Sequence, residues 1–544
     1  MDFPVNLQLS EIWNDPKKLL PYLREWVQIQ RWTGTSTTYK DTIIEKDEFI
    51  LFNSDSYKFI GFLVELITKR EDNPAFTYFV PIEMARSVET SQQFPIRLKC
   101  QDQILSIRSA ESNPQFFQTL LEHLTKGHKI QSANSNSIQF KPFSSKLEKS
   151  LKIKSNFLLG DGNTTNTLYK ITCDDNTQWV CKIYRILSRN PETKMLKMLY
   201  EEGFHQVPQP LGLMNIKIHD SIFTLMLFSE HVEAQGDGGL PFWKNLNTQI
   251  AGWKIGKKIQ PIENYCKTLG QTVADLHYYS SKINDALFKP ENINKKDIEN
   301  WKEKIRSLFQ ISYDTLQIEF NTNIDIRTRL NHLDTFVKQM IHSKSWDLLN
   351  GTMKIKIHQD LHLAQMLTTE SSGKITFTIL DFEGDPLLSI EEKFQKDPIF
   401  RDLASIHSAF HYIKYNALKD QSKMKYNLSN QDFINIYFQT LDSHLENDKK
   451  KSNPFQPLIS FSKQWEDLCQ KLFLTSYLNR LKTYKLNFNL KLDEATGFKD
   501  VLRNFRMERF VKELYYETLF RKSNVIIPIL GLFELEQGAS ETRN

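Results

Sequence analysis

The feature that most constrains the fold is a change of pattern near Gly236. Before this residue, short apolar runs rich in strand-favouring residues alternate with turns, as in LYKIT and WVCKIYR, joined by the turn DDNT at 174–177. After it, apolar residues recur at helical spacing over 260–345, 390–450 and 460–522. The sequence therefore predicts an α+β fold in which a strand-rich part is followed by a mostly helical part.

Local signals refine this division. Asn190-Pro191 predicts the start of a helix, with Asn as the N-cap and Pro at the first helical position, and Gly203 predicts its end. Inside the helical part, KIKIH at 354–358 and ITFTILDF at 375–382 predict two strands, with SSGK as a turn. A strand-rich lobe followed by a helical lobe with a small hairpin is the layout of protein-kinase-like enzymes.

Composition limits the class of protein. A chain of 544 residues with 40% hydrophobic and 25% charged residues can build more than one ordinary domain. The formal charge of +5 is spread along the chain, which suits an anionic nucleotide and argues against nucleic acid. Five scattered cysteines without a CxxC pair predict a reduced protein, and no apolar run is long enough for a membrane helix. We therefore expect a cytoplasmic protein without a membrane partner.

The strongest chemical signal lies in the segments HQDLHLAQ, at 358–365, and ILDFEGDP, at 379–386. Asp360 and Gln365 are five residues apart, like the catalytic Asp and metal-binding Asn of protein kinases. Asp381 ends an apolar strand about twenty residues later, where a kinase places its second metal ligand. The spacing predicts phosphoryl transfer, with Asp360 as the base and with Gln365 and Asp381 as ligands of Mg²⁺.

The same segment allows another interpretation. His358-x-Asp360-x-His362 could form the metal cluster of a hydrolase, with imidazole ligands. No second cluster of histidines and carboxylates in the sequence completes such a shell, so phosphoryl transfer is favoured.

A candidate nucleotide loop lies upstream, in LLGDGNTTNTLYKI at 158–171. Gly160 and Gly162 would let the backbone approach phosphates, whereas a plain hairpin turn is the alternative interpretation. Three residues could donate hydrogen bonds to a nucleotide: Thr165, Asn166 and Thr167. Lys182 lies within an apolar strand and needs an anionic partner, which in kinases is an ATP phosphate together with a helix glutamate.

At these motifs the sequence resembles the maltokinase family, bacterial and archaeal enzymes that make maltose 1-phosphate from maltose and ATP. The family's loop reads close to HGDYHLGQ and its later strand ends in DFEGEP, against HQDLHLAQ and DFEGDP here. Further similar segments are EEGFHQVPQPLG at 201–212, EHVEAQGDG at 230–238, LGQTVADLH at 269–277 and RDLA at 401–404. The resemblance implies a bilobal protein-kinase-like fold with three parts: a cap and intermediate module at 1–150, a nucleotide lobe at 151–235 and a helical lobe at 236–544.

The resemblance also implies functional roles. Lys182 would contact ATP, and the segment around Glu230 would line the adenine site. The residues that it places beside the sugar are His362, Arg401, His411 and Tyr516. A possible partner is an enzyme of trehalose or glycogen metabolism, such as a trehalose synthase.

Several positions depart from the family pattern. Gln359 replaces the Gly of HGD, and Lys194 stands near the expected helix glutamate, so Glu192 is the nearest acid for Lys182. Ser408 and His411 stand where the family has Arg and Asp. Because these last changes fall on the sugar side, we expect a working sugar kinase whose acceptor is maltose or another sugar, an amino sugar or an aminoglycoside. A non-catalytic partner of a glucan-pathway enzyme is the remaining alternative.

Overall fold

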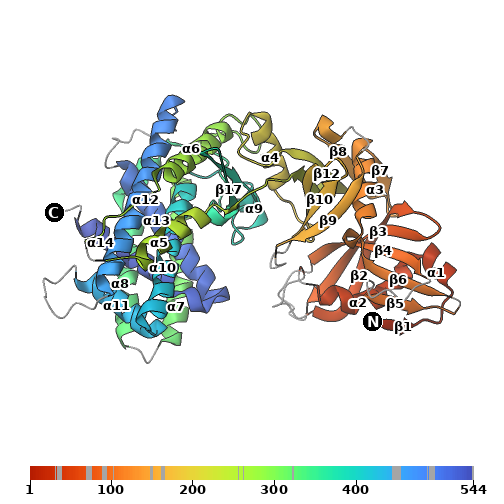
Figure 1. Ribbon diagram of the computed structural model, residues 1–544, viewed down its shortest axis with the longest axis horizontal. Coiled ribbons are helices and arrows are strands. Elements are labelled where there is room, and N and C mark those ends of the chain that lie inside the picture. Colours follow the sequence, from red (N-terminus) through yellow and green to blue (C-terminus); the bar gives the residue numbers. More distant parts are fainter. Residues whose placement is uncertain are drawn as a thin grey trace. The chain divides into compact units, whose positions relative to one another are not determined.

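The computed structural model describes residues 1–30, 32, 39–68, 76–87, 95–101, 103–147, 151–160, 166–254, 256–260, 262–320, 324–443, 455–486, 488 and 497–541. The chain divides into two compact units: Met1–Lys197 with Pro208–Val232, and Met198–Val207 with Glu233–Asn544. Both large sheets, drawn in red to yellow in Figure 1, belong to the first unit, whereas the long green to blue helices belong to the second. The predicted α+β division is confirmed.

The first sheet has the strand order β1-β5-β6-β4-β3-β2. Its strands and the two helices beside it are β1 (Asp2–Pro4), α1 (Leu9–Asn14), α2 (Leu20–Gln28), β2 (Tyr39–Asn53), β3 (Tyr57–Thr68), β4 (Phe76–Ser87), β5 (Ile96–Lys99) and β6 (Ile104–Ser109). Side chains alternate along β3, so Phe59 and Leu63 enter one core while Ile60 and Phe62 enter another with α1 and α2. Burial on both faces explains the nearly continuous apolar run FIGFLVELI.

The second sheet has the order β7-β8-β12-β13-β11-β10-β9. The elements around it are α3 (Pro114–Thr125), β7 (Lys129–Gln131), β8 (Ser137–Pro142), β9 (Ile153–Leu159), β10 (Thr167–Cys173), β11 (Gln178–Ile183), β12 (Pro210–Ile218), β13 (Ser221–Glu230) and α4 (Glu192–Glu201), which begins in this unit. Phe116, Phe117 and Leu120 of α3 share a core with Ile171 and Met214 of the sheet. Because β7 and β8 pair into this sheet, it begins before the boundary that was expected at residue 150.

The second unit is a helical body with short strands. Its elements are β14 (Gly236–Asp237), α5 (Leu240–Ala251), α6 (Glu263–Ser280), β15 (Glu291–Asn292), α7 (Lys295–Glu319), α8 (Ile324–Ile341), β16 (Met353–Lys354), β17 (Met366–Ser371), β18 (Lys374–Ile379), α9 (Ile390–Lys393), α10 (Phe400–Tyr426), α11 (Asn430–Ser443), α12 (Gln456–Thr483), α13 (Gly497–Phe520) and α14 (Ile526–Glu541). Helices α6 and α12 pack closely at Gly270: a Cβ on this residue would lie 2.4 Å from the carbonyl oxygen of Phe473, so only glycine fits there. Among the described residues, no helix combines the length and apolarity needed to cross a bilayer.

The hairpin of the second unit differs from the prediction. Strand β18 covers most of ITFTILDF, but its partner is β17, which the sequence did not predict, and SSGK supplies the turn between them. KIKIH forms a strand only at its start, in β16, and Ile355 makes an isolated bridge with Asp397. Residues 356–358 are buried but pair with no strand among the described residues. The alternating pattern of KIKIH therefore corresponds to a buried loop and not to a strand.

Candidate active site

The loop of residues 358–365 is fixed by one buried carboxylate. Asp402, in the first turn of α10, is fully buried. Its two oxygens accept the backbone N–H groups of His358 and Gln359, each at 3.0 Å. His277 of α6 lies 3.3 Å from the same carboxylate. Since a carboxylate that accepts two backbone donors holds their peptide groups in one orientation, Asp402 sets the course of the loop before Asp360.

The loop also holds the segment that carries Asp381. The ring of His358 donates from Nε2 to the carbonyl oxygen of Leu380 at 2.7 Å and packs against Phe382. Leu380 N donates to the carbonyl oxygen of Gln365 at 2.9 Å. These contacts bring Gln365 and Asp381 to neighbouring backbone positions, and Asp381 takes a left-handed φ of 61°. A carboxylate and an amide oxygen form a donor set that suits Mg²⁺.

The geometry of His358 argues against the hydrolase interpretation. Its Nε2 is used by Leu380, and its Nδ1 accepts the backbone N–H of Asp360 at 3.3 Å. With both ring nitrogens engaged, His358 has no lone pair to give to a metal. Its side chain therefore has a structural role, joining the two loops.

Asp360 is held between two basic groups. Its Oδ1 accepts a hydrogen bond from Arg509 of α13 at 3.2 Å, and His362 Nε2 lies 3.6 Å from its Oδ2. Burial by itself would raise the pKa of Asp360, but the hydrogen bond with His362 and the charge of Arg509 together hold the pKa well below its usual range. Asp360 is therefore a carboxylate at any physiological pH.

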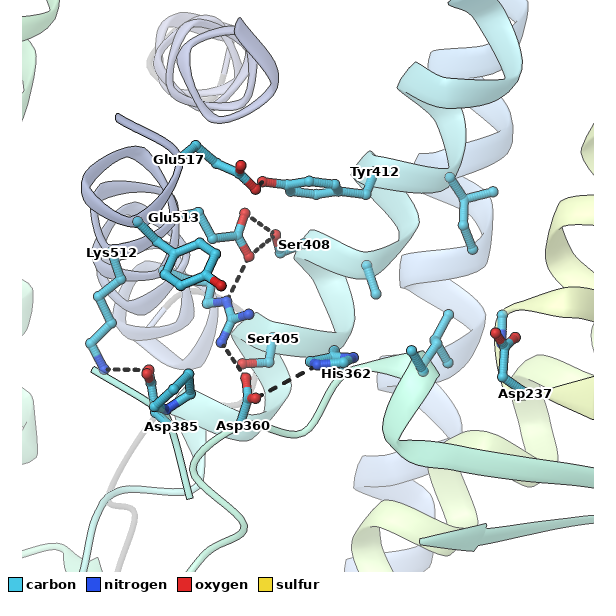
Figure 2. A pocket seen from close by; sticks show the side chains of 18 of the residues that line it. Asp237, Asp360, His362, Asp385, Ser405, Ser408, Tyr412, Lys512, Glu513 and Glu517 are labelled. Carbon is cyan, nitrogen blue, oxygen red and sulfur yellow. Dashed lines mark hydrogen bonds and ion pairs between the residues drawn. The ribbon is translucent and has the colours of Figure 1, made fainter. Parts of the chain in front are cut away.

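A cavity of about 580 Å³ opens beside Asp360 within the second unit. Its lining includes two groups of polar residues, and Figure 2 labels Asp360 and His362 of the first group and every residue of the second. The group at the 358–365 loop, here called the loop end, consists of Asp360, His362 and Arg509. The group between α10 and α13, here called the helix end, consists of Ser408, Tyr412, Glu513 and Glu517. Trp243, Ile413 and Tyr516 add apolar surface between polar groups.

Carboxylates dominate the helix end. Ser408 Oγ donates to both oxygens of Glu513, at 2.8 and 3.0 Å, and Tyr412 donates to Glu517 Oε1 at 3.4 Å. Glu517 Oε2 accepts no hydrogen bond from the described residues, and its nearest cation is Arg521 Nε at 3.7 Å. Burial raises the pKa of Glu517; Arg521 opposes this shift and Glu513 adds to it. The helix end therefore brings two carboxylates to the cavity lining, which favour a hydrogen-bond donor or a cation as a ligand.

Two of the four residues predicted beside the sugar line the cavity, namely His362 and Tyr516. Arg401 does not: it is bound to Asp397 and to Glu508, and its guanidinium stacks over Trp301. His411 points into the core, where Nε2 donates to the carbonyl oxygen of Ile527 at 3.0 Å. Placing Arg401 and His411 against the substrate was wrong, because neither lines the cavity and both side chains face partners inside the protein.

The sequence prediction missed the contribution of α13 to this site. Arg509, Glu513 and Glu517 are spaced four residues apart, which places them on one face of a helix. Tyr516 was the only residue of this helix that was predicted to face the cavity. The four-residue spacing of charges is the signal that could have revealed the others.

The first unit contains the residues predicted to bind a nucleotide. Lys182 donates to Glu192 Oε2 at 2.7 Å, and Tyr184 donates to the same oxygen at 2.5 Å, so the partner of Lys182 is Glu192, the acid that the sequence offered nearest to it without deciding the pairing. Thr167 Oγ1 accepts from Arg185 Nε at 2.9 Å, and Glu230, at the end of β13, forms an ion pair with Lys146.

The tip of the nucleotide loop is less completely described. Gly160 follows β9 with a left-handed φ of 74°, and Asn166 precedes β10. Gly162 and Thr165 lie outside the described residues. Their predicted contacts with a nucleotide stay predictions.

Comparison with known proteins gives the fold. No protein-family model matches the chain. A solved structure of a glucosamine kinase in complex with glucosamine, ADP and inorganic phosphate is similar, with a TM-score of 0.59 and 14% identity over 94% of this chain and 98% of that chain. Crystal form B of a glucosamine kinase gives 0.59 and 13%, over 93% and 96%, and crystal form A gives 0.56 and 15%, over 91% of each. The chain thus has the bilobal kinase-like fold of these structures over nearly its whole length.

Proposed function

We propose that this protein is an ATP-dependent kinase that phosphorylates a hydroxyl group of a sugar carrying an amino group. The observation that carries the proposal is the cavity itself: a half-buried, ionised Asp360 lies at one end and an acidic helix end lies at the other. The kinase-like fold supports the reaction class, and the order of Lys182, Asp360, Gln365 and Asp381 along the chain matches that of a phosphotransferase.

Asp360 would act on the acceptor. A hydroxyl group placed in the loop end lies within reach of its carboxylate, which orients the oxygen for attack on the terminal phosphate and receives its proton. His362 and Arg509 keep this carboxylate ionised and fix its direction. Gln365 and Asp381 would hold Mg²⁺, which when bound neutralises charge on the phosphates.

Lys182 would bind ATP phosphates. The Lys182–Glu192 ion pair resembles the pair that kinases use to hold the phosphates of ATP. Tyr184 donates a hydrogen bond to the same oxygen of Glu192, so two side chains hold this carboxylate. Glu192 and Tyr184 are buried, and Lys182 is half-buried. This arrangement favours an active kinase over a non-catalytic partner, since a chain without phosphate contacts has no need to bury such a pair.

The charge balance of the cavity favours an amino sugar over a neutral sugar. The lining holds five carboxylates, Asp237, Asp360, Asp385, Glu513 and Glu517, against three permanent cations, Arg509, Lys512 and Arg521. Each cation already faces a carboxylate: Arg509 contacts Asp360 and Glu513, Lys512 lies 3.8 Å from Asp385, and Arg521 lies 3.7 Å from Glu517. A protonated amine would compensate the remaining negative charge of the lining.

Maltose is the second candidate acceptor. The resemblance to maltokinases in the loop sequences supports it, and a cavity of about 580 Å³ has room for a disaccharide. In that case the helix end would accept hydrogen bonds from sugar hydroxyls instead of an ammonium group. A partnership with a glucan-pathway enzyme belongs to this second candidate.

The test is a comparison of acceptors. The protein is incubated with ATP, Mg²⁺ and glucosamine, glucose or maltose, and the products are identified by mass, with Asp360→Asn as the control for contaminating kinases. We expect phosphorylated glucosamine, formed with a higher kcat/KM than phosphorylated glucose, which differs only in the amino group. Faster transfer to maltose would establish the second candidate. Transfer that is equal in the wild type and the Asp360→Asn variant would refute both.

A further inference from the structure

Gln359, the residue directly before Asp360, has an unusual backbone. Its φ is 74°, in the left-handed region that glycine adopts easily and that side chains with a Cβ disfavour. The corresponding residue of the similar maltokinase loop is Gly. The fold therefore holds a long side chain in a conformation for which glycine would be the simplest choice, so the side chain must be stabilised elsewhere.

The side chain of Gln359 is buried and fully hydrogen-bonded. Nε2 donates to Asp397 Oδ2 at 2.8 Å, to the carbonyl oxygen of Glu392 at 3.1 Å and more weakly to that of Gln395 at 3.4 Å. Oε1 accepts from Lys356 Nζ at 2.8 Å. The amide thus connects the loop before Asp360 to the segment that follows α9.

The same amide lies against the loop that follows Asp381. A Cβ built on Gly384 would be 2.7 Å from Gln359 Oε1, and Gly384 itself has a φ of 81°. Because residue 384 is a glycine, it leaves room for the amide of Gln359. Gln359 therefore belongs to the loop that carries Asp360 and Gln365, and its side chain contacts the loop that follows Asp381.

A second route leads from Gln359 back to Asp360. Asp397 binds Arg401, and Arg401 binds Glu508 through two hydrogen bonds, at 2.7 and 3.1 Å. Glu508 directly precedes Arg509, which contacts Asp360. A chain of contacts thus runs from Gln359 through Asp397, Arg401 and Glu508 to Arg509, and Arg509 contacts the carboxylate of Asp360, the residue next to Gln359.

We propose that Gln359 is a positioning residue, whose buried amide fixes the left-handed turn before Asp360 and keeps the 358–365 loop in register with the loop carrying Asp381 and Gly384. This inference rests on the proposed function, because it takes Asp360 as the base of phosphoryl transfer. Loss of the amide would free the turn and remove one hydrogen-bond partner each from Lys356 and Asp397, which keep the carbonyl oxygen of Lys393 and the guanidinium of Arg401, while the cavity lining would stay as it is.

The first experiment measures steady-state kinetics of Gln359→Gly, with the acceptor identified by the substrate comparison above. Glycine relieves the backbone strain, so the variant isolates the role of the amide. We expect kcat to fall about 10- to 100-fold, while KM for ATP and for the acceptor changes less than about threefold. Gln395→Ala is the matched control, because Gln395 contributes only its carbonyl oxygen and its side chain is exposed; it should keep wild-type kcat. An unchanged kcat in Gln359→Gly would overturn the inference, and so would a rise in KM without a change in kcat.

The second experiment tests the contact with Gly384 and uses Gly384→Ala in the wild-type and Gln359→Gly backgrounds. Alanine at residue 384 collides with the amide only when Gln359 is present, so it should lower kcat more in the wild type than in Gln359→Gly. Equal losses in the two backgrounds would show that the loops are not coupled through this amide. If Gln359→Gly does not fold, Lys356→Met replaces it, since this change removes the donor to Oε1 together with its second hydrogen bond, to the carbonyl oxygen of Lys393, and a wild-type kcat in that variant would overturn the inference. An inactive wild type would instead refute the proposed function.

Discussion

The two ends of the cavity are built on different principles. At the loop end, Asp360 lies against Arg509 and His362, and Asp402 holds the loop behind it by two backbone hydrogen bonds. At the helix end, Glu517 keeps an oxygen that accepts no hydrogen bond from the described residues. Fixed charges at the loop end suit one chemical step, whereas the carboxylates Glu513 and Glu517 at the helix end suit selection among ligands. The contrast predicts that mutations at the two ends will change different kinetic constants.

The largest effect is expected at the loop end. Asp360→Asn should lower kcat by about 10²- to 10⁴-fold, since it removes the general base and keeps the shape of the side chain. KM for the acceptor should change little. The measurement is initial-rate kinetics together with a thermal melt that shows a folded variant. Turnover near the wild-type value would mean that Asp360 is not the base, and the contrast between the two ends would disappear.

At the helix end, Glu517→Gln should weaken recognition of the amine. A charge-assisted hydrogen bond contributes about 1.5–3 kcal/mol, which corresponds to a 10- to 100-fold lower kcat/KM for glucosamine. The kcat/KM for glucose, measured on the same protein, should remain within about threefold of the wild-type value. An equal decrease in kcat/KM for the two sugars would show that Glu517 shapes the cavity but does not bind the amino group.

Tyr516 should have a smaller effect, because it offers a ring face and no charge. Loss of an aromatic contact of about 1 kcal/mol predicts that Tyr516→Ala raises the acceptor KM about fivefold and leaves the KM for ATP unchanged. Leu519→Ala is the matched control, since Leu519 follows on the same helix, is 46% exposed and does not line the cavity. An equal rise in both KM values would remove Tyr516 from the acceptor site.

The smallest effect concerns stability beneath the loop end. Burial lowers the pKa of Lys356 to about 8, against opposing contributions from Asp397 and Asp402, with Lys393 adding to the decrease. Above pH 8, Lys356 is largely deprotonated in the native state but still protonated in the unfolded chain. The free energy of unfolding therefore increases as the pH rises from about 8 toward the pKa of lysine in the unfolded chain. From pH 7 to 8.5 the gain is about 1 kcal/mol. Urea denaturation of the wild type and Lys356→Met at both pH values isolates the effect, and identical pH responses would contradict it.

The same contrast separates what the sequence could predict from what it could not. Asp360, Gln365 and Asp381 lie in two short segments, so their spacing alone was enough to predict the roles now proposed for them. The pair of Lys182 and Glu192 also follows from local order, with one strand leading to the next helix. The helix end joins α10 to α13, about one hundred residues apart, and its contacts depend on how these helices pack.

Arg401 and His411 illustrate the limit. Both have the polarity expected of sugar ligands, and the resemblance placed them in the right helix. Packing decides their direction, however: Arg401 faces two buried carboxylates and His411 faces α14. For a polar residue on a helix that is buried on several sides, residue type cannot tell a ligand-binding position from an internal ion pair.

The excess of carboxylates over cations in the cavity lining has a practical consequence for inhibition. An acidic cavity wall attracts any small protonated amine, whether or not that amine carries a hydroxyl group in reach of Asp360. Tris, a protonated amine with three hydroxyl groups, should therefore compete with the acceptor and raise its apparent KM. Amines without a hydroxyl group would occupy the same wall as dead-end ligands, which makes them a starting point for competitive inhibitors directed at the helix end.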